Sequence, residues 1–413
     1  MPGARLFMSS LQPTPPTAIL VFPDFRAYLD RANTILALAG ILPRVHLITK
    51  QPLPDELGPL PSALSLHVPP SSARGLRFLA FALQESHRLL RALPRSEPVV
   101  LHDFFVPWIG PFLRRLTPRP ELLVITSLYA NNVELWRTRA WRDDDHHRCT
   151  LEDLEYLALL GRRLALEYLA HRTSNLITGN STGLLEDFRT FFGTSPDHLR
   201  FWPSEVDAAI FRPSAEIRPI HEPLILCVGR ILVRRKGLDT LLEAFSSLSS
   251  RHPSARLRLC GGADQREQTR LEHLLHDHPA ADRIEVTHAK NRLELLAQYR
   301  EAKVFVSFSR NEGSPRTLKE ALACGLPAVV SDIAGHRAVD PDGRVLRFVA
   351  LNDSRGLAEA LADLLDRPDH GKRLGEAGRA LMLAEYTPAR IAERLVELYK
   401  EGLERKRRAG LTS

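Results

Sequence analysis

The sequence predicts an α/β protein with two doubly wound domains, in which parallel strands alternate with helices. Three observations predict this class. Short apolar runs alternate with segments of helical periodicity in both halves of the chain. A stretch rich in proline and polar residues, from Ser204 to Pro223, separates the two series. The 413 residues, 44% of them hydrophobic, exceed one ordinary core and suit two domains of about 200 residues each.

Each half of the chain carries one alternating series. Strands of the first half are expected at Ala18–Phe22, Val45–Ile48, Leu64–Val68, Val99–Leu101, Leu122–Ile125 and Leu176–Thr178. Its helices are expected at Arg31–Leu38, Gly75–Leu93, Pro111–Leu116, Leu151–Ala170 and Thr182–Phe192. Strands of the second half are expected at Leu224–Val228, Arg256–Cys260, Ile284–Thr287, Val304–Val306 and Ala328–Val330. Such alternation implies right-handed crossovers and ligand sites at the carboxyl ends of strands. The cleft between the two domains is therefore the expected site.

The sequence indicates a cytoplasmic protein. No apolar run reaches the roughly 18 residues of a membrane span, and Met1 to Pro16 lacks the apolar region of a secretory signal. The cysteines have neither disulfide nor zinc-site spacing; they are Cys149, Cys227, Cys260 and Cys324. We interpret them as buried thiols in a reducing compartment.

The chain is basic, with a formal net charge of +7. This balance favours anionic partners, namely nucleotide phosphates, anionic lipid surfaces or nucleic acid. The densest cluster, Arg405 to Arg408, is typical of a solvated helix end, with a membrane or nucleic-acid patch as the alternative. No nucleic-acid-binding module is recognisable, so we expect no nucleic-acid partner.

The richest candidate segment runs from Ser307 to Val330. A strand is followed by a short loop and then by a helix over Thr317 to Cys324, which Gly325 ends. Ser314 is expected as the helix N-cap, with Pro315 at the first helical position. The preceding glycine, Gly313, lets a ligand approach the backbone closely.

The start of this helix predicts an anion site flanked by two carboxylates. The N–H groups of Arg316, Thr317 and Leu318 point out of the helix start, where the dipole favours a diphosphate. Glu312 lies in the loop, and Glu320 lies about 9 Å along the helix axis at 1.5 Å per residue. That span suits a sugar, a diphosphate and a ribose in a row, whose hydroxyls can donate to the carboxylates. An ordinary capped helix with surface glutamates is the alternative.

A second candidate segment, Val228 to Gly237, follows the first strand of the second half. Arg230 and Lys236 can both reach a phosphate at the strand end, one as a planar fork and the other as a point charge. Loops rich in Arg and Lys are often simply solvated, and that interpretation stays open for this segment alone.

Together the two segments resemble the retaining glycosyltransferases of the GT-B fold, specifically the glycosyl transferases group 1 family (family 4). The resemblance is strong over Leu224 to Leu364. Its motifs are Gly229-Arg230 with Lys236-Gly237, Glu312-Gly313 through Glu320-Ala321, and Ala323-Cys324-Gly325-Leu326-Pro327. Phe201 to Pro213 looks like the family's interdomain stretch, with Ser204-Glu205 in place of the usual Asn-Gly.

The resemblance implies a role for each matching residue. Arg230 and Lys236, beside Gly229, would hold the donor diphosphate and act in catalysis. Glu320 would bind the ribose hydroxyls, and Glu312 would lie beside the transferred sugar as a catalytic residue. The backbone that would cradle phosphate comprises Gly313, Ser314, Pro315, Arg316 and Thr317.

The resemblance also implies the domain layout and the reaction. Residues 1–206 would form an acceptor-binding domain with a loose leader at 1–16. Residues 207–386 would bind the nucleotide-sugar donor, and residues 387–413 would form a helix that crosses back onto the first domain. The expected enzyme moves a hexose-type sugar from a nucleoside diphosphate to a hydroxyl of a glycan, glycolipid or small metabolite. It would retain configuration and need no metal or other cofactor.

Three segments depart from the family pattern. Phe22-Pro23-Asp24-Phe25 replaces a glycine-rich loop, Thr126 to Tyr129 replaces a segment with a histidine, and Ala334 to Arg337 lacks a downstream glutamate. His102, after the strand Val99–Leu101, can supply a cleft residue and is a candidate catalytic residue. A structural role for His102 is the alternative.

Two further features have competing interpretations. Asp143 to His147 offers carboxylate and imidazole ligands, but its place before a helix favours a charged loop, so no metal site is expected. The helix Gly75–Leu93 combines an apolar stripe with arginines. Peripheral contact with the inner membrane face and packing on the first sheet both explain that stripe.

Two other functions fit the same fold. A nucleotide-sugar isomerase would need an acid/base for each face of the sugar, and no matched pair is present. A non-catalytic sugar-nucleotide-binding protein would not need the glutamate pair with Arg230 and Lys236, although the altered segments near Phe22 and Leu128 leave it open.

Overall fold

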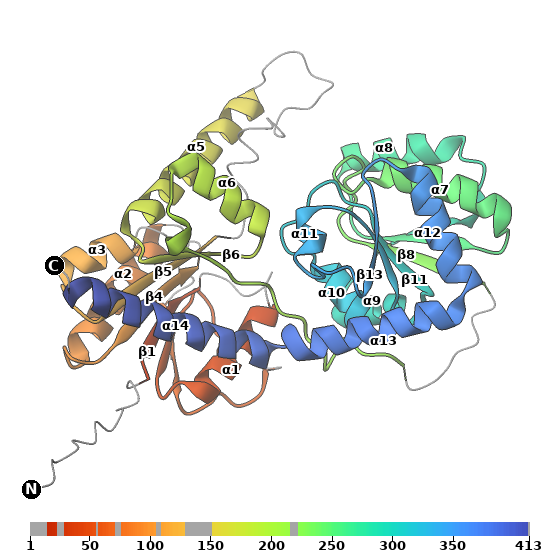
Figure 1. Cartoon of the computed structure of the whole chain (residues 1–413). Helices are drawn as coiled ribbons and strands as arrows, with labels where there is room; N and C mark the ends of the chain where they lie inside the picture. Colours follow the sequence, from red (N-terminus) through yellow and green to blue (C-terminus); the bar gives the residue numbers. More distant parts are fainter. Residues whose placement is uncertain are drawn as a thin grey trace, which may run out of the picture. The chain divides into compact units, whose positions relative to one another are not determined.

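The computed structural model describes residues 15–22, 29–54, 57–70, 76–104, 109–128, 151–214 and 222–411 (Figure 1). The chain divides into two compact units. The first comprises residues 1–127, 161–177 and 392–413, and the second comprises residues 128–160 and 178–391. Compactness thus groups residues 178–206 with the second unit, although strand β7 (Leu199–Phe201) hydrogen-bonds into the first sheet. The loop Pro23 to Phe25, Tyr129, and the cluster Asp143 to His147 lie outside the described residues.

The first sheet has seven strands in the order β3-β2-β1-β4-β5-β6-β7. Besides β7, they are β1 Thr17–Val21, β2 Val45–Ile48, β3 Leu64–His67, β4 Val99–Phe104, β5 Leu122–Leu128 and β6 Leu176–Gly179. The neighbouring pairs from β3 to β5 are parallel. Every residue of β1, β4 and β5 is buried, which explains why they read as continuous apolar runs. The associated helices are α1 Leu29–Ile41, α2 Leu76–Ala92, α3 Ile109–Leu116, α5 Leu151–Thr173 and α6 Thr182–Phe192.

The second sheet has six parallel strands in the order β10-β9-β8-β11-β12-β13. They are β8 Leu224–Val228, β9 Arg256–Cys260, β10 Ile284–Thr287, β11 Val304–Ser307, β12 Ala328–Ser331 and β13 Leu346–Val349. The predicted fold of two doubly wound parallel sheets is confirmed. In this sheet the strand order reverses between β8 and β11, which marks the edge where such folds bind ligands.

Helices cover both faces of the second sheet (Figure 1). On one face pack α7 Leu238–Arg251, α8 Gln265–His276 and α12 Ser354–Asp366. On the other pack α9 Arg292–Glu301, α10 Arg316–Ala323 and α13 Pro368–Glu385. The short α11 spans Ala334–Arg337. These two apolar layers fix the strand ends that carry the candidate site.

The apolar stripe of α2 packs inside the first unit. Phe78 is buried, and Leu79, Phe81 and Leu83 pack against the same cluster of strand residues. Core packing therefore accounts for the stripe. Among the described residues no helix is both long and apolar enough to cross a membrane.

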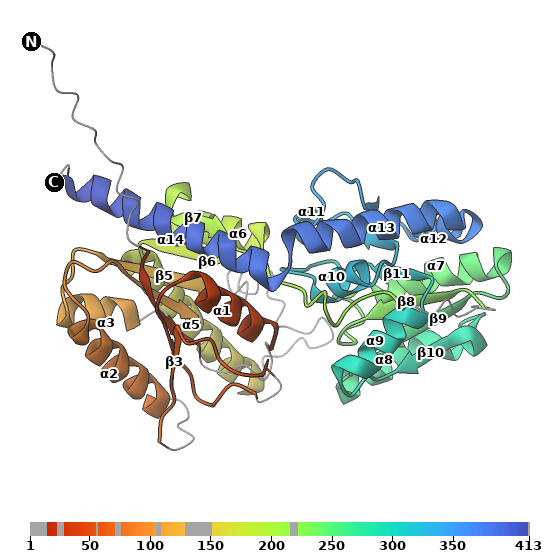
Figure 2. The same ribbon diagram turned by 90° about the horizontal axis from the view of Figure 1, so that it is seen from below.

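Helix α14 (Pro388–Leu411) belongs to the first unit from residue 392 onward (Figure 2). Leu395, Tyr399 and Leu403 are buried. Near its end, Lys406 donates to the backbone oxygen of Leu122, and Arg407 pairs with Glu121 at 2.9 Å. These two cations are therefore paired and partly buried, whereas Arg408 is exposed, as expected of a solvated helix end.

His102 links β4 to α14. Its side chain is fully buried. Its Nδ1 lies 2.9 Å from the hydroxyl of Tyr399, and its Nε2 lies 2.7 Å from the hydroxyl of Ser127. Burial, helped by the charge of Arg31, lowers the pKa of His102 to about 3. The ring is thus neutral and occupied on both nitrogens, a geometry that favours the structural alternative over a catalytic role.

The neutral state of His102 predicts a specific acid sensitivity. Its pKa rises to about 6.5 on unfolding, so its contribution to stability is complete above pH 6.5 and is lost as pH falls toward 3. By linkage, about 2 kcal/mol of unfolding free energy should be lost between pH 7 and pH 5. His102→Asn should remove that part of the pH dependence, measured by denaturant unfolding at both pH values. His276→Asn, at an exposed position, is the control; equal slopes for wild type and His102→Asn would contradict the assignment.

Candidate functional site

Two loops meet at the carboxyl ends of β8 and β11. The first, residues 229–237, leads from β8 into α7, and the second, residues 308–315, leads from β11 into α10. Because β8 and β11 are hydrogen-bonded neighbours, their following loops lie side by side. The two segments singled out in the sequence are therefore brought together.

A partly buried ion pair joins the two loops. The ammonium of Lys236 lies 2.5 Å from Oε1 of Glu312, and the hydroxyl of Ser309 donates to the same oxygen at 2.7 Å. Burial raises the pKa of Glu312, but the charge of Lys236 and these hydrogen bonds outweigh it and hold the pKa below its ordinary value. Glu312 is therefore ionised at neutral pH beside a cation.

The backbone conformation at Gly237 sets the position of Lys236. Gly237 has φ +59° and caps the start of α7, and a Cβ there would lie 2.2 Å from the backbone oxygen of Phe308. The loop before α7 thus rests directly on the chain leaving β11. Only glycine combines this left-handed conformation with so close an approach.

Arg310, in the second loop, bonds both α7 and the first loop. Its guanidinium forms a bidentate pair with Asp239, with both distances 2.9 Å, and it also bonds Asn352. Its backbone N–H donates to the backbone oxygen of Arg235 at 2.8 Å. Sequence reasoning missed Arg310 because its partners lie far along the chain.

A third strand end supports the first loop. The N–H of Gly229 donates to the oxygen of Cys260, and the N–H of Ile231 donates to the oxygen of Gly262. A Cβ at Gly261 would lie 1.7 Å from the backbone oxygen of Gly229. The pair Gly261-Gly262 after a strand was the available signal for this close approach.

Arg230 faces outward from the first loop. It is exposed and makes no hydrogen bond or ion pair with any residue that the structure describes. Together with Gly229 and Lys236 it lines a pocket at the end of β8. Its guanidinium is thus available to an anionic ligand.

Helix α10 begins one residue after the expected first helical position, Pro315, and its cap differs. Arg316 is the first helical residue and Pro315 is the N-cap, without a side-chain cap bond. The expected N-cap role of Ser314 is wrong, because its hydroxyl bonds Lys319 at 2.9 Å and Ser204 at 2.5 Å instead. The first N–H groups of α10, including that of Thr317, still lack acceptors within the helix.

A buried tyrosine, Tyr299, donates a hydrogen bond to Glu320. The hydroxyl of Tyr299 lies 2.8 Å from Oε2 of Glu320 and 3.2 Å from the backbone oxygen of Thr317. Burial, with the charge of Glu320, raises the pKa of Tyr299, so the tyrosine is a neutral donor. This hydrogen bond orients the carboxylate of Glu320. The sequence did not reveal it, because Tyr299 lies on a different helix.

Ten of the eleven candidate residues therefore lie in the two loops and the first turns of α10; they are Gly229, Arg230, Lys236, Glu312, Gly313, Ser314, Pro315, Arg316, Thr317 and Glu320. His102 lies in the core of the other unit. Within the described residues, no group of three or more His, Cys, Asp or Glu side chains is arranged to hold a metal ion.

Solved structures share this two-sheet architecture. Sucrose-phosphate synthase from Thermosynechococcus elongatus superimposes with a TM-score of 0.65 at 20% identity, over 94% of this chain and 98% of that chain. HepE from Anabaena, crystallised with UDP, gives a TM-score of 0.66 at 13% identity, over 93% and 100%. The chain therefore has the GT-B glycosyltransferase fold.

The sequence comparison is more specific. Residues 213–381 match the model of the glycosyl transferases group 1 family. It is 30% identical to the alpha-maltose-1-phosphate synthase of Mycolicibacterium smegmatis, over 57% of this chain and 65% of that protein. It is 28% identical to a GDP-mannose-dependent phosphatidylinositol monomannoside mannosyltransferase of Mycobacterium tuberculosis, over 55% and 62%. The chain thus spans less than two thirds of either relative.

The close contact at Gly237 can be tested by comparing two glycines of positive φ. Gly237→Ala should cost about 3 kcal/mol, from strained φ and from the clash with Phe308. Gly193→Ala, at φ +67° with open space around it, should cost about 1 kcal/mol, from φ alone. Denaturant unfolding of both variants measures the difference, and equal losses would argue against the contact.

Proposed function

We propose that this protein is a retaining glycosyltransferase that moves a hexose-type sugar from a nucleoside diphosphate to a hydroxyl acceptor. The observation that carries the proposal is the Lys236–Glu312 pair, which lies at the strand-order reversal beside the start of α10. It brings a cation for the diphosphate and a carboxylate for the sugar into one place. The match of residues 213–381 to the glycosyl transferases group 1 family supports the reaction class.

Cations and helix amides stabilise the leaving group in this mechanism. Arg230 and Lys236 bind the diphosphate, and the N–H groups at the start of α10 add a fixed positive field. As the glycosidic bond breaks, negative charge grows on the phosphate oxygen that these groups face. They supply the charge that a divalent metal would otherwise provide, so we propose a metal-independent reaction.

The two glutamates orient the ends of the donor. Glu320, fixed by Tyr299, accepts from the ribose hydroxyls, and Glu312 accepts from hydroxyls of the transferred sugar. The acceptor attacks the face that the diphosphate leaves, and the departing phosphate takes the proton of the acceptor hydroxyl. Configuration at the sugar carbon is then retained.

The comparisons support a nucleoside diphosphate donor without naming its base. The similar HepE structure was solved with UDP-glucose, whereas a relative is named as GDP-mannose-dependent. The acceptor class, whether glycan, glycolipid or small metabolite, stays a prediction.

Thermal stabilisation identifies the donor. We expect one among UDP-, GDP-, ADP- and dTDP-sugars to raise the unfolding midpoint by about 5–10 °C at a hundredfold excess over Kd. The shift should persist in EDTA, because the protein's own cations bind the diphosphate. Loss of the shift in EDTA would overturn metal independence, and absence of any shift would overturn donor binding.

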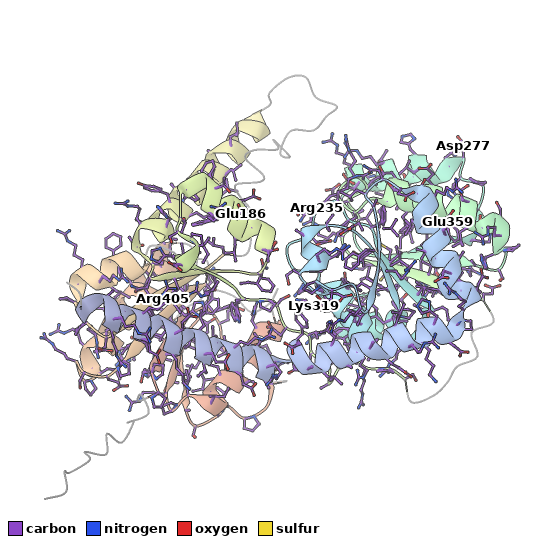
Figure 3. All side chains as sticks on the ribbon, in the orientation of Figure 1. Glu186, Arg235, Asp277, Lys319, Glu359 and Arg405 are labelled. Carbon is purple, nitrogen blue, oxygen red and sulfur yellow. The ribbon has the colours of Figure 1, made fainter. Side chains whose placement is uncertain are left out.

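Arg230→Ala tests the catalytic assignment. Loss of one charge facing the leaving group should lower kcat by about 100-fold or more with little change in folding stability, since Arg230 is exposed. Arg235→Ala is the matched control, because it removes an exposed cation from the same loop (Figure 3). Donor turnover with and without acceptor measures the effect; equal kcat for both variants would contradict the role of Arg230.

A further inference from the structure

A lysine is buried beneath the loop that leads into α10. Lys319, labelled in Figure 3, is only 1% exposed. Its ammonium lies 2.6 Å from the backbone oxygen of Ser204, 2.9 Å from the hydroxyl of Ser204 and 2.9 Å from the hydroxyl of Ser314. It also lies 4.8 Å from the centre of the Tyr386 ring.

Burying an ammonium costs free energy, so the presence of a lysine at this buried position needs an explanation. Transfer of a charged group out of water is unfavourable unless it is well bonded. A methionine or leucine in the same helix position would fill the space without that cost. The ammonium of Lys319 and the hydroxyl of Ser204, however, both contact the hydroxyl of Ser314. Ser314 lies in the loop of residues 308–315, to which we assign the donor diphosphate.

Counting protons fixes the direction of the hydrogen bonds. An ammonium only donates, so both hydroxyl oxygens accept from Lys319. The two hydroxyls are 2.5 Å apart, so one of them donates to the other. Ser204 is buried and Ser314 is partly exposed. A donor bond from Ser204 to Ser314 satisfies the buried proton and leaves the proton of Ser314 for a ligand.

We infer that Lys319 is a positioning residue that presets Ser314 to donate its hydroxyl proton to the donor diphosphate. Lys319 does not touch the ligand; it holds the oxygen of Ser314 in place and polarises its O–H bond, which strengthens donation to an anionic oxygen. The inference rests on the proposed function, because it assigns the diphosphate to this loop.

The test compares nucleoside diphosphates with nucleosides. Calorimetry of the full chain with UDP, GDP, ADP and dTDP, and with the four matching nucleosides, separates the diphosphate contribution from binding of the base and ribose. In Lys319→Met we expect affinity for the bound diphosphate to fall about tenfold or more, with affinity for the nucleoside unchanged. Lys303→Met, an exposed change at the start of β11, should leave both unchanged.

A double-mutant cycle decides whether Lys319 acts through Ser314. Ser314→Ala should lose a similar factor for the diphosphate, and adding Lys319→Met should lower affinity less than about twofold further, because coupled residues are not additive. Additive losses would show that Lys319 acts independently and would overturn the inference. An equal loss for nucleoside and diphosphate in Lys319→Met would indicate a merely structural role and overturn it too.

Two further results are distinguishable from these. If Lys319→Met does not fold, Ser314→Ala alone still decides, since unchanged diphosphate affinity in that variant overturns the inference. If the wild-type protein binds none of UDP, GDP, ADP and dTDP, the proposed function fails and the inference fails with it. Diphosphate binding in wild type with no specific loss in the variants refutes the inference alone.

Discussion

The second unit is organised around one electrostatic constraint: a carboxylate removed from water needs a cation in contact with it. Glu312 is largely buried, and an unpaired charge there would cost several kcal/mol. Lys236 meets that need from a different loop. The ends of β8 and β11 must therefore be held in register, and most of the contacts around the site serve that end.

Contacts from three different elements hold the Lys236–Glu312 pair in place. Gly237 lets the first loop rest on the backbone after β11, Arg310 ties the second loop to α7, and Gly261 brings the end of β9 beneath Gly229. Contacts within the protein itself therefore hold the pair in place. Such preorganisation is what electrostatic stabilisation of a leaving group requires, because no groups need to reorganise during the reaction.

Sequence reasoning recovered what periodicity and local motifs encode. The two parallel sheets and the segments carrying Lys236, Glu312 and Glu320 followed from apolar runs and from residues close together in the chain. The strand order within each sheet, and the strands β7 and β13, were not predicted. It failed where the role of a residue depends on contacts with side chains from distant segments of the chain. Ser314 fits a helix cap by its position, but Lys319 and Ser204 compete successfully for its hydroxyl. His102 fits a cleft residue by its place after a strand, yet the ring is held by Tyr399, almost three hundred residues later.

The placement of α14 has a consequence for the order of events during synthesis. Residues 178–391 form a contiguous stretch that can complete its own core, whereas the first unit needs Tyr399 and its neighbours from α14. On the ribosome, where domains generally fold as they emerge, the strands made first must wait for a helix made after the second unit. Until α14 arrives, the side chain of His102 and the adjoining strand residues that α14 covers stay open to water. The early chain thus exposes, for most of translation, the apolar residues that α14 later covers.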